Sequence, residues 1–264
     1  MKIVHAAMIG DVIGEPGLIA LEENLPRIVQ ENSIDFTVAN GENIADGFGM
    51  TEAGLQRMLA CGVDAVTSGN HVWEKREFWP ALGGNYPLLR PANYYGDSPG
   101  RGWISIEKAG ISWAVINVQG REFMTPIDCP FRCCDSIIET FDATAPLHVI
   151  IVDFHAESSR EKEALGYYLD GRAALFAGTH THVQTADERI LPKGTAYITD
   201  LGMTGISNSV IGMDIKICLE RTRTQVPYHM EPAACQQKND AAVQGIIAEI
   251  DADTGKAISV RRIN

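Results

Sequence analysis

Short apolar runs alternate with amphipathic stretches in the N-terminal part of the chain. Residues 3–9, 36–39 and 65–68 form apolar runs of the length that buried strands have. Residues 15–31 and 51–61, which lie between them, carry apolar side chains near helical spacing. This order of strand, helix, strand, helix and strand predicts a parallel sheet with helices packed on its faces.

The rest of the chain continues this mixed pattern. Two β-rich runs at 102–107 and 111–118 are joined by Lys108-Ala109-Gly110, which predicts a hairpin. Other expected elements are helices at 130–141 and 159–169, strands at 148–154, 173–177 and 196–199, and a C-terminal antiparallel pair at 245–251 and 257–263. No repeat, low-complexity tract or linker interrupts the sequence. We therefore expect one domain spanning 1–264, with two packed sheets and helices outside them.

The amino-acid composition limits the kinds of molecule that the protein is expected to bind. The net charge of −12 argues against non-specific nucleic-acid binding, which needs clustered Lys and Arg. A small phosphorylated ligand remains compatible with this charge, because bound cations can supply positive charge locally. No apolar run approaches the roughly 18 residues that cross a membrane, so we expect no membrane association. The run at 3–9 is interpreted as a strand and not as a signal peptide, which predicts a cytoplasmic protein.

Six cysteines are present, and they show neither a CxxC pair nor the framework of a small secreted domain. Cys129, Cys133 and Cys134 lie close together in the sequence, but no Cys or His pair at zinc spacing accompanies them. Free thiols in a reducing compartment are the expected state.

Potential metal ligands follow five of the expected strands, at the point where each strand ends. They are Asp11, then Glu42 and Asn43, then Asn70 and His71, then His155, and finally His180 and His182. Each has a plainer explanation by itself, such as a turn residue, a helix cap or a core histidine. Ligands bind beyond the carboxyl ends of the strands in open α/β sheets, so their placement after all five strands predicts one shared site.

The residue types indicate the chemistry of this site. His180 and His182 alternate, so both imidazoles can face one centre if the segment is extended. Carboxylate, amide and imidazole donors without thiolates suit Mn, Fe or Zn. Even without His71, the seven remaining donors exceed the needs of one tetrahedral ion but suit two ions that share a carboxylate. Two metals about 3.5–4 Å apart stabilise in-line displacement at phosphorus and lower the pKa of a bound water toward ~7.

The strand-end residues resemble a known family. Together with Gly10-Asp11-Val12-Ile13-Gly14 and Gly178-Thr179-His180-Thr181-His182, they resemble the motifs of calcineurin-like metallophosphoesterases, and more narrowly those of the bacterial YmdB-like branch. The segments 197–205 and 209–212 also resemble that branch, so the resemblance runs from about residue 3 to the C-terminus. It implies an α/β fold with a four-layer α/β/β/α sandwich of two mixed sheets, homo-oligomers, and hydrolysis of phosphodiesters that include cyclic nucleotides.

The resemblance also implies a role for each strand-end residue. One metal ion would be bound by Asp11, Glu42, Asn43 and His182, and the second by Glu42, Asn70, His155 and His180. Ile13 stands where the wider superfamily has a histidine ligand, and Asn43 would fill that place. His71 matches the position that protonates the leaving oxygen or steadies the phosphoryl group.

We therefore expect a phosphodiesterase that uses two divalent or trivalent Fe, Mn or Zn ions and a metal-bridging hydroxide. The expected substrate is a small phosphodiester, such as a 2',3'- or 3',5'-cyclic nucleotide. Thr204 and Ser209, on a Gly-rich loop, are candidate substrate contacts, and a plain turn explains them equally well. Phe48 and Met50 are candidates to flank a base, and simple packing is the more common role of such residues.

Other functions remain open at this point. One is a phosphomonoesterase with the same metal pair, and another is a slow-turnover regulatory protein that binds metal and nucleotide. A metallopeptidase is a weaker alternative, because no HExxH motif occurs in the sequence.

Overall fold

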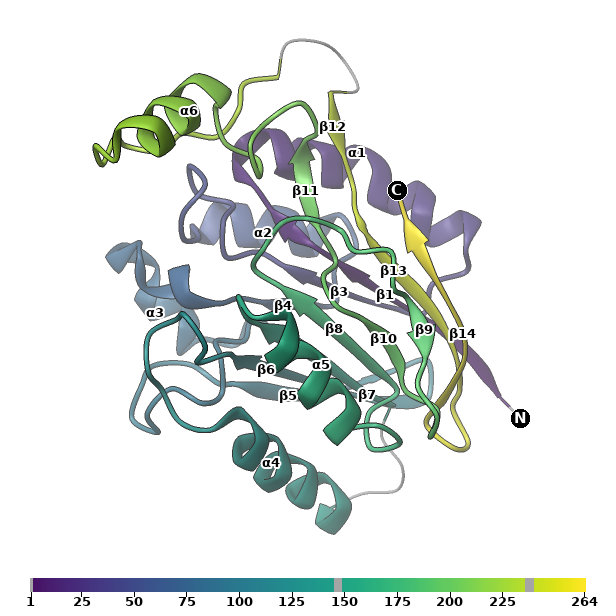
Figure 1. Cartoon of the computed structure of the whole chain (residues 1–264). Helices are drawn as coiled ribbons and strands as arrows, with labels where there is room; N and C mark the ends of the chain where they lie inside the picture. Colours follow the sequence, from purple (N-terminus) through teal and green to yellow (C-terminus); the bar gives the residue numbers. More distant parts are fainter. Residues whose placement is uncertain (1, 145–148, 236–239) are drawn as a thin grey trace.

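The structure is a computed structural model that describes residues 2–144, 149–235 and 240–264. Its largest features are two mixed β-sheets (Figure 1). The first has five strands in the order β14-β13-β1-β3-β4, with β1 at Ile3–Ile9, β3 at Phe36–Asn40, β4 at Ala65–Thr67, β13 at Gly245–Asp251 and β14 at Lys256–Ile263. Strands β1, β3 and β4 are parallel, whereas β13 and β14 run antiparallel to their neighbours.

The second sheet has six strands in the order β5-β6-β7-β8-β10-β9. Its strands are β5 (Trp103–Lys108), β6 (Ile111–Gln119), β7 (Val149–His155), β8 (Leu175–Thr179), β10 (Ala196–Ile198) and β9 (Arg189–Ile190). The four central strands are parallel, and the edge strands β5 and β9 are antiparallel. The carboxyl ends of β6, β7, β8 and β10 therefore lie along one edge of this sheet.

A third, smaller sheet was not expected from the sequence, so the prediction of two sheets is incomplete. It has the order β12-β11-β2, with β2 at Asp11–Val12, β11 at Met203–Ile206 and β12 at Ala241–Ala242. A Cβ atom at Gly10 would lie 2.3 Å from the carbonyl oxygen of Gly202, so glycine is required for this close approach. Such short strands carry too few residues for a hydrophobic period to reveal them.

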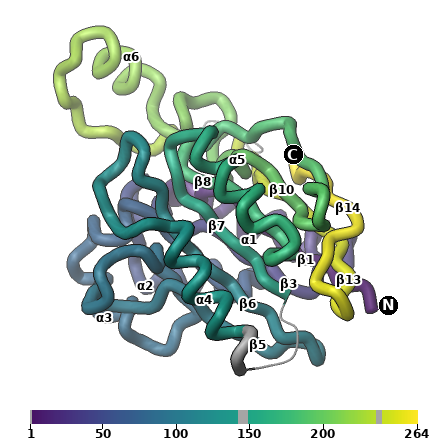
Figure 2. The backbone as a smooth tube through the Cα atoms, turned by 60° about the horizontal axis from the view of Figure 1, so that its bottom comes forward, coloured from purple at the N-terminus to yellow at the C-terminus, as the bar shows by residue number. Residues whose placement is uncertain are grey.

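The helices lie outside the two large sheets. They are α1 (Gly14–Glu31), α2 (Glu52–Ala60), α3 (Trp79–Leu82), α4 (Pro130–Thr144), α5 (Ser159–Tyr168) and α6 (Ile215–Thr224), with short 3-10 helices at Asn70–Trp73 and Arg76–Phe78. One apolar cluster joins α1 and α2 to the five-stranded sheet, and another joins α4 and α5 to the six-stranded sheet. Helix α6 protrudes from the body of the molecule (Figure 2). No helix in the described ranges is long and apolar enough to span a membrane.

The inner faces of the two large sheets share a core. A third cluster contains Met8 and Val38 from the first sheet together with Val115 and Ile151 from the second. Between them, the rings of Phe36 and Trp113 stack with centroids 4.8 Å apart. Burying so many apolar side chains holds the two sheets against each other, and with them the strand ends that carry the polar residues.

Most elements lie where the sequence predicts them, within one or two residues. The expected strand at 148–154 corresponds to β7, although His148 itself lies outside the described residues. Helix α6 was not anticipated, because only Cys218 among its residues is buried and the helix shows no broad apolar stripe. Within the described ranges no disulfide links any of the six cysteines.

Candidate metal centre and active-site pocket

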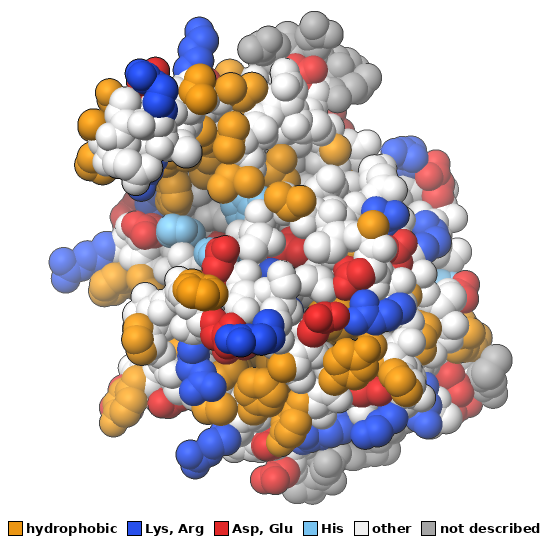
Figure 3. All heavy atoms as spheres, viewed as in Figure 1, with side chains coloured by type: hydrophobic (Ala, Val, Ile, Leu, Met, Phe, Trp, Pro, Cys, Tyr) orange, Lys and Arg blue, Asp and Glu red, His pale blue; other side chains and the backbone are white. Residues whose placement is uncertain are grey.

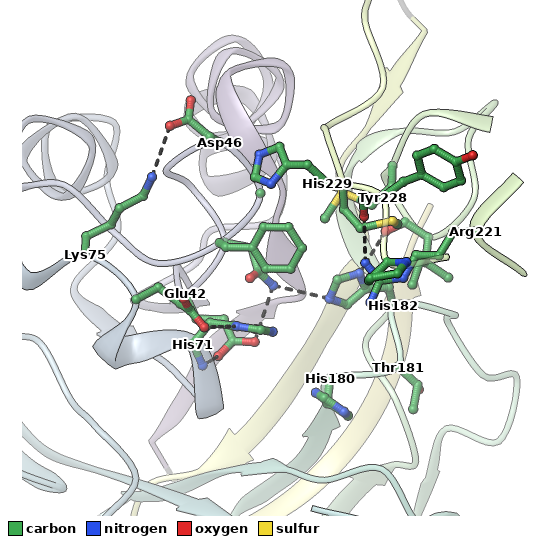
Figure 4. Close-up of a pocket in the computed structure, with 18 of the residues that line it drawn as sticks. Glu42, Asp46, His71, Lys75, His180, Thr181, His182, Arg221, Tyr228 and His229 are labelled. Carbon is green, nitrogen blue, oxygen red and sulfur yellow. Dashed lines mark hydrogen bonds and ion pairs between the residues drawn. The ribbon is translucent and has the colours of Figure 1, made fainter. Parts of the chain in front are cut away.

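The predicted strand-end residues meet in one cluster, although they come from different sheets. Figure 4 labels four of them, which are Glu42, His71, His180 and His182. Asp11 follows β1, Glu42 and Asn43 follow β3, and Asn70 follows β4. His155 ends β7, and His180 follows β8. Because β1, β3 and β4 are parallel, as are β7 and β8, each sheet brings its carboxyl ends to the same place.

Four side chains surround one point of the cluster. His155 Nε2 lies 3.0 Å from Glu42 Oε1, 3.0 Å from Asn70 Oδ1 and 3.0 Å from His180 Nδ1. A single imidazole nitrogen cannot hydrogen-bond all three atoms with good geometry. Donor atoms of Glu42, His155 and His180 lie within 4.8 Å of one another, close enough to ligate one ion. This arrangement of lone pairs suits a cation between them.

A second group lies on the other side of Glu42. The Asn43 amide nitrogen lies 3.3 Å from Glu42 Oε1 and 3.3 Å from His182 Nε2. His182 Nε2 is also 3.7 Å from Asp11 Oδ1. Glu42 thus contacts both groups, as expected of a carboxylate that two ions share.

The three histidines are held by oxygen atoms on the side away from the cluster. The bonded pairs are His155 Nδ1 and Thr179 Oγ1 at 2.9 Å, His180 Nε2 and Glu157 Oε2 at 3.2 Å, and His182 Nδ1 and the Ile211 carbonyl at 2.9 Å. The Thr179 hydroxyl donates a hydrogen bond to Asp153 Oδ1 at 2.7 Å, so its oxygen accepts the hydrogen bond from His155 Nδ1. Bonds of this kind fix the ring orientation and leave the inner nitrogen able to bind a metal.

Buried oxygens without partners support the same interpretation. Among the described residues, Asp11 Oδ1 and Asn43 Oδ1 are buried and have no hydrogen-bond partner. An unsatisfied buried carboxylate oxygen is costly, because it has lost its hydration without compensation. A bound cation would satisfy both atoms, so the donor set fits the metal ions that the family resemblance implies.

The pKa values of the cluster reflect strong coupling between buried charges. Burial raises the pKa of Asp11 to about 6, against the opposing effect of His182 and His155. Burial also raises the pKa of Glu42, but the positive charge of His155 and hydrogen bonds from His155 and His71 outweigh it and lower that pKa to about 2. Burial lowers the pKa of His180 to about 3, and the charge of His155 adds to this effect. Glu42 is therefore anionic and His180 neutral, the forms that bind metal. Burial lowers the pKa of His155, but the charge of Glu42 outweighs this effect and raises that pKa to about 9, so a cation would have to displace a proton from His155.

His71 lies at the edge of the cluster. Its backbone N–H donates to Glu42 Oε2 at 3.1 Å, and its Nδ1 lies 3.2 Å from Glu74 Oε1. The Phe48 ring packs edge-on against the imidazole, with centroids 5.0 Å apart. The side chain lines the pocket, so its Nε2 is placed to reach a bound molecule (Figure 4).

The cluster opens into a pocket of about 980 Å³. Figure 3 shows it as a hollow with histidine side chains, beside the apolar surface of the α6 segment. The walls beyond the cluster that the sequence did not single out include Asp46, Lys75, Arg221, Tyr228 and His229. Arg221 Nη1 donates to the Tyr228 carbonyl at 2.8 Å, which ties the segment after α6 to the helix. A pocket of this size can hold a nucleotide.

The other candidate substrate contacts have different environments. Phe48 lines the pocket, whereas Met50 is fully buried in the core beneath α1 and α2. Ser209 Oγ donates to the Ile206 carbonyl at 2.6 Å and accepts from Gly212 N, so it is part of a turn. Thr204 is buried beside β2, and its Oγ1 has no partner among the described residues. Neither Ser209 nor Thr204 is among the residues that line the pocket.

The two histidines of the His-Thr-His segment reach the cluster in an unexpected way. β8 ends at Thr179, and His180 and His182 have positive φ angles of 98° and 62°. They are therefore not alternate residues of an extended segment, as the sequence suggested. Each left-handed residue costs about 1–3 kcal/mol and persists only where its surroundings fix it. The resulting bend places His180 beside His155 and His182 beside Asn43.

Asp200 and Lys162 hold this bent segment, and sequence reasoning missed both roles. Asp200 Oδ2 accepts from the Thr181 hydroxyl at 2.6 Å and from its backbone N–H at 3.3 Å. Lys162 Nζ donates to the same oxygen at 2.7 Å, and both charged side chains are 1% exposed. Asp200 lies in the segment 197–205, and the resemblance of this segment to the YmdB-like branch is the one feature of the sequence that points to it.

We expect Lys162→Met to destabilise the protein by about 3–5 kcal/mol, because the buried Asp200 carboxylate would lose its counter-ion. Chemical denaturation measures this change. The matched control is Arg172→Ala, which breaks the ion pair between Arg172 and Asp135, whose side chains are 35% and 32% exposed. Loss of this exposed ion pair should lower the free energy of unfolding by no more than about 1 kcal/mol. Equal destabilisation by the two variants would contradict the argument.

The fold and this cluster define the class of protein. A putative 5'-nucleotidase from Staphylococcus aureus superimposes with a TM-score of 0.62 at 15% identity, over 99% of this chain and 54% of that one, which shows the fold alone. With carboxylate, amide and imidazole donors at its strand ends, the chain is a calcineurin-like metallophosphoesterase. The family model described as YmdB-like protein matches residues 7–263, so the chain belongs to the YmdB-like family.

Two relatives resemble the chain over nearly its whole length. A 2',3'-cyclic-nucleotide 2'-phosphodiesterase of Bacillus subtilis (strain 168) is 44% identical over 97% of this chain and 94% of its own. The crystal structure of a protein from Mycoplasma pneumoniae, described as a novel phosphatase, superimposes with a TM-score of 0.91 at 31% identity, over 100% of this chain and 93% of that one.

Proposed function

We propose that this protein is a metal-dependent phosphodiesterase that hydrolyses small phosphate diesters, with cyclic nucleotides as the substrate class. The observation that carries the proposal is the buried cluster around Glu42, in which Asp11 Oδ1 and Asn43 Oδ1 have no hydrogen-bond partner among the described residues. The 2',3'-cyclic-nucleotide 2'-phosphodiesterase of B. subtilis, at 44% identity, supports this substrate class, with 2',3'-cyclic nucleotides favoured over 3',5'-cyclic ones.

The distances support a division of the ligands into two sets. In this proposal one ion is held by Asp11, Glu42, Asn43 and His182, and the second by Glu42, Asn70, His155 and His180. Two bound cations of the Fe, Mn or Zn type would neutralise phosphoryl charge and acidify a water at neutral pH.

The chain itself does three things in this proposal. Its outer oxygens, including Thr179 and the Ile211 carbonyl, keep the inner histidine nitrogens directed at the cluster. The pocket walls orient the substrate so that one ester oxygen lies near His71. His71 then donates a proton to that leaving oxygen, which is the work of a general acid.

A pair of chromogenic substrates tests the proposal. We expect hydrolysis of bis(p-nitrophenyl) phosphate in the presence of Mn²⁺ to exceed that of p-nitrophenyl phosphate, and EDTA to abolish both. A preference for the monoester would favour the phosphomonoesterase alternative. No turnover of either ester or of 2',3'-cyclic AMP by the metal-loaded protein would favour the regulatory binding protein.

Three further expectations from the sequence are part of the proposal. They are a four-layer α/β/β/α sandwich in one domain over 1–264, assembly as a homo-oligomer, and a cytoplasmic location. The stacking of three apolar clusters across the two large sheets and their helices supports the first of these.

A further inference from the structure

A second cleft, as large as the active-site pocket, lies between β5 and α4. These two elements lie side by side in Figures 1 and 2. The cleft has a volume of about 990 Å³, and its walls come from residues 90–93, 101–105 and 128–137. Within the described part of the chain it shares no lining residue with the pocket at the metal centre. Its chemistry therefore needs a separate explanation.

Arginine dominates the charged groups of this cleft. Arg90, Arg101 and Arg132 line it together with one carboxylate, that of Asp128. The active-site pocket, by contrast, has four acidic residues on its walls, and the whole chain has a net charge of −12. Across residues 2–144, 149–235 and 240–264, no ion pair within 4.0 Å neutralises any of the three guanidinium groups. A local excess of positive charge in such an acidic protein favours an anionic ligand.

Arg90 is the most unusual of the three. It is 6% exposed, and its guanidinium donates to the main-chain carbonyl oxygens of Pro91, Ala92, Ser98 and Pro99, at 2.8–3.5 Å. Burial lowers the pKa of this guanidinium. A buried cation without a counter-ion is costly. An anion bound in the cleft would therefore be attracted by the Arg90 charge, and it would lower the cost of burying that charge.

Arg101 and Arg132 are exposed at the mouth of the cleft and can contact a ligand directly. Arg101 donates through Nη2 to the Gly84 carbonyl at 2.9 Å, which leaves most of its N–H groups for other partners. The guanidinium fork matches phosphate oxygens in bidentate geometry. Trp103 and Ile137 add an apolar wall, and the Trp103 side chain is 37% exposed there.

We propose that this arginine cleft binds a small phosphate ester, with the phosphate at Arg101 and Arg132 and the organic part against Trp103. The long-range field of Arg90 strengthens the attraction without direct contact. This site is independent of the metal centre and does not require the proposed hydrolytic function.

Isothermal titration calorimetry on the purified, metal-loaded protein tests the arginine cleft. Inorganic phosphate and the non-hydrolysable phenylphosphonate are the probes. The metal centre can also bind phosphate, so two binding events per chain are expected for the wild type. The double variant R101A/R132A should lose one event, since removing each charged donor weakens binding by about tenfold or more. Arg27→Ala removes one positive charge from the exposed face of α1, and it should leave both phosphate-binding events unchanged.

The Trp103 wall is tested separately. Phenylphosphonate should bind the cleft about tenfold more tightly than phosphate, because its ring buries apolar surface, and Trp103→Ala should remove that gain. Circular dichroism melting confirms that each variant is folded. If the double variant fails to fold, the exposed single change Arg132→Gln should still weaken one event by about tenfold. Identical isotherms for wild type, Arg132→Gln and Arg27→Ala would overturn the proposal.

Discussion

Replacing Glu42 by Gln should remove most of the bound metal and reduce phosphodiester hydrolysis by about 10³-fold or more. Glu42 is the residue that contacts both halves of the cluster. One carboxylate oxygen lies 3.0 Å from His155 Nε2 and 3.3 Å from the Asn43 amide, and the other accepts the His71 N–H. Glutamine keeps the shape but loses the charge that two cations would share. Metal content measured by inductively coupled plasma mass spectrometry checks the first half of the prediction.

A buried glutamate elsewhere provides the matched control for Glu42. Glu161 is 6% exposed, and its carboxylate accepts the backbone N–H groups of Arg121 and Glu122. Glu161→Gln should lower stability while the metal content per folded chain stays at the wild-type level. If Glu42→Gln instead retained two ions per chain, Glu42 would not be the shared ligand, and the division into two ligand sets would have to be abandoned.

The meeting of the strand-end residues could be predicted from the sequence for a topological reason. In a parallel sheet the carboxyl end of every strand lies at one edge, so polar residues far apart in the sequence can be assigned to one place. His155 and His180 illustrate this, since they come at the ends of the parallel strands β7 and β8 and their ring nitrogens lie 3.0 Å apart. Glu42 follows β3 of the other sheet, and it meets His155 at 3.0 Å because the two sheets pack against each other. The prediction needed only strand boundaries, which the apolar runs mark clearly.

The groups that hold the donors in place could not be found in the same way. Asp200 follows β10, whereas Thr181 follows β8 and Lys162 lies in α5, and no spacing in the sequence links the three positions. The bend at His180 and His182 depends on backbone angles that non-glycine residues rarely adopt, so propensity argues against it. The arginine cleft likewise joins residues of three separate segments that show no spacing pattern.

Replacing His71 by Ala should reduce hydrolysis of a 2',3'-cyclic nucleotide by about 10²–10⁴-fold, the usual contribution of a general acid. Metal content should not change, because the contact of His71 with Glu42 is made by its backbone N–H, which alanine retains. The effect on bis(p-nitrophenyl) phosphate should be much smaller, since p-nitrophenolate leaves without being protonated. Steady-state kinetics on both substrates measures the two effects.

The difference between the two substrates separates proton donation from simple electrostatic support. If His71 acted only by stabilising charge on the phosphoryl oxygens, both esters would lose activity to a similar extent, since those oxygens are common to them. His5→Ala is the matched control, because His5 lies in β1 beside Asp35 and Glu249 and lines no wall of the active-site pocket in the described chain. Equal losses on the two esters in His71→Ala would therefore reassign His71 from proton donor to charge stabiliser, while the metal cluster would keep its proposed role.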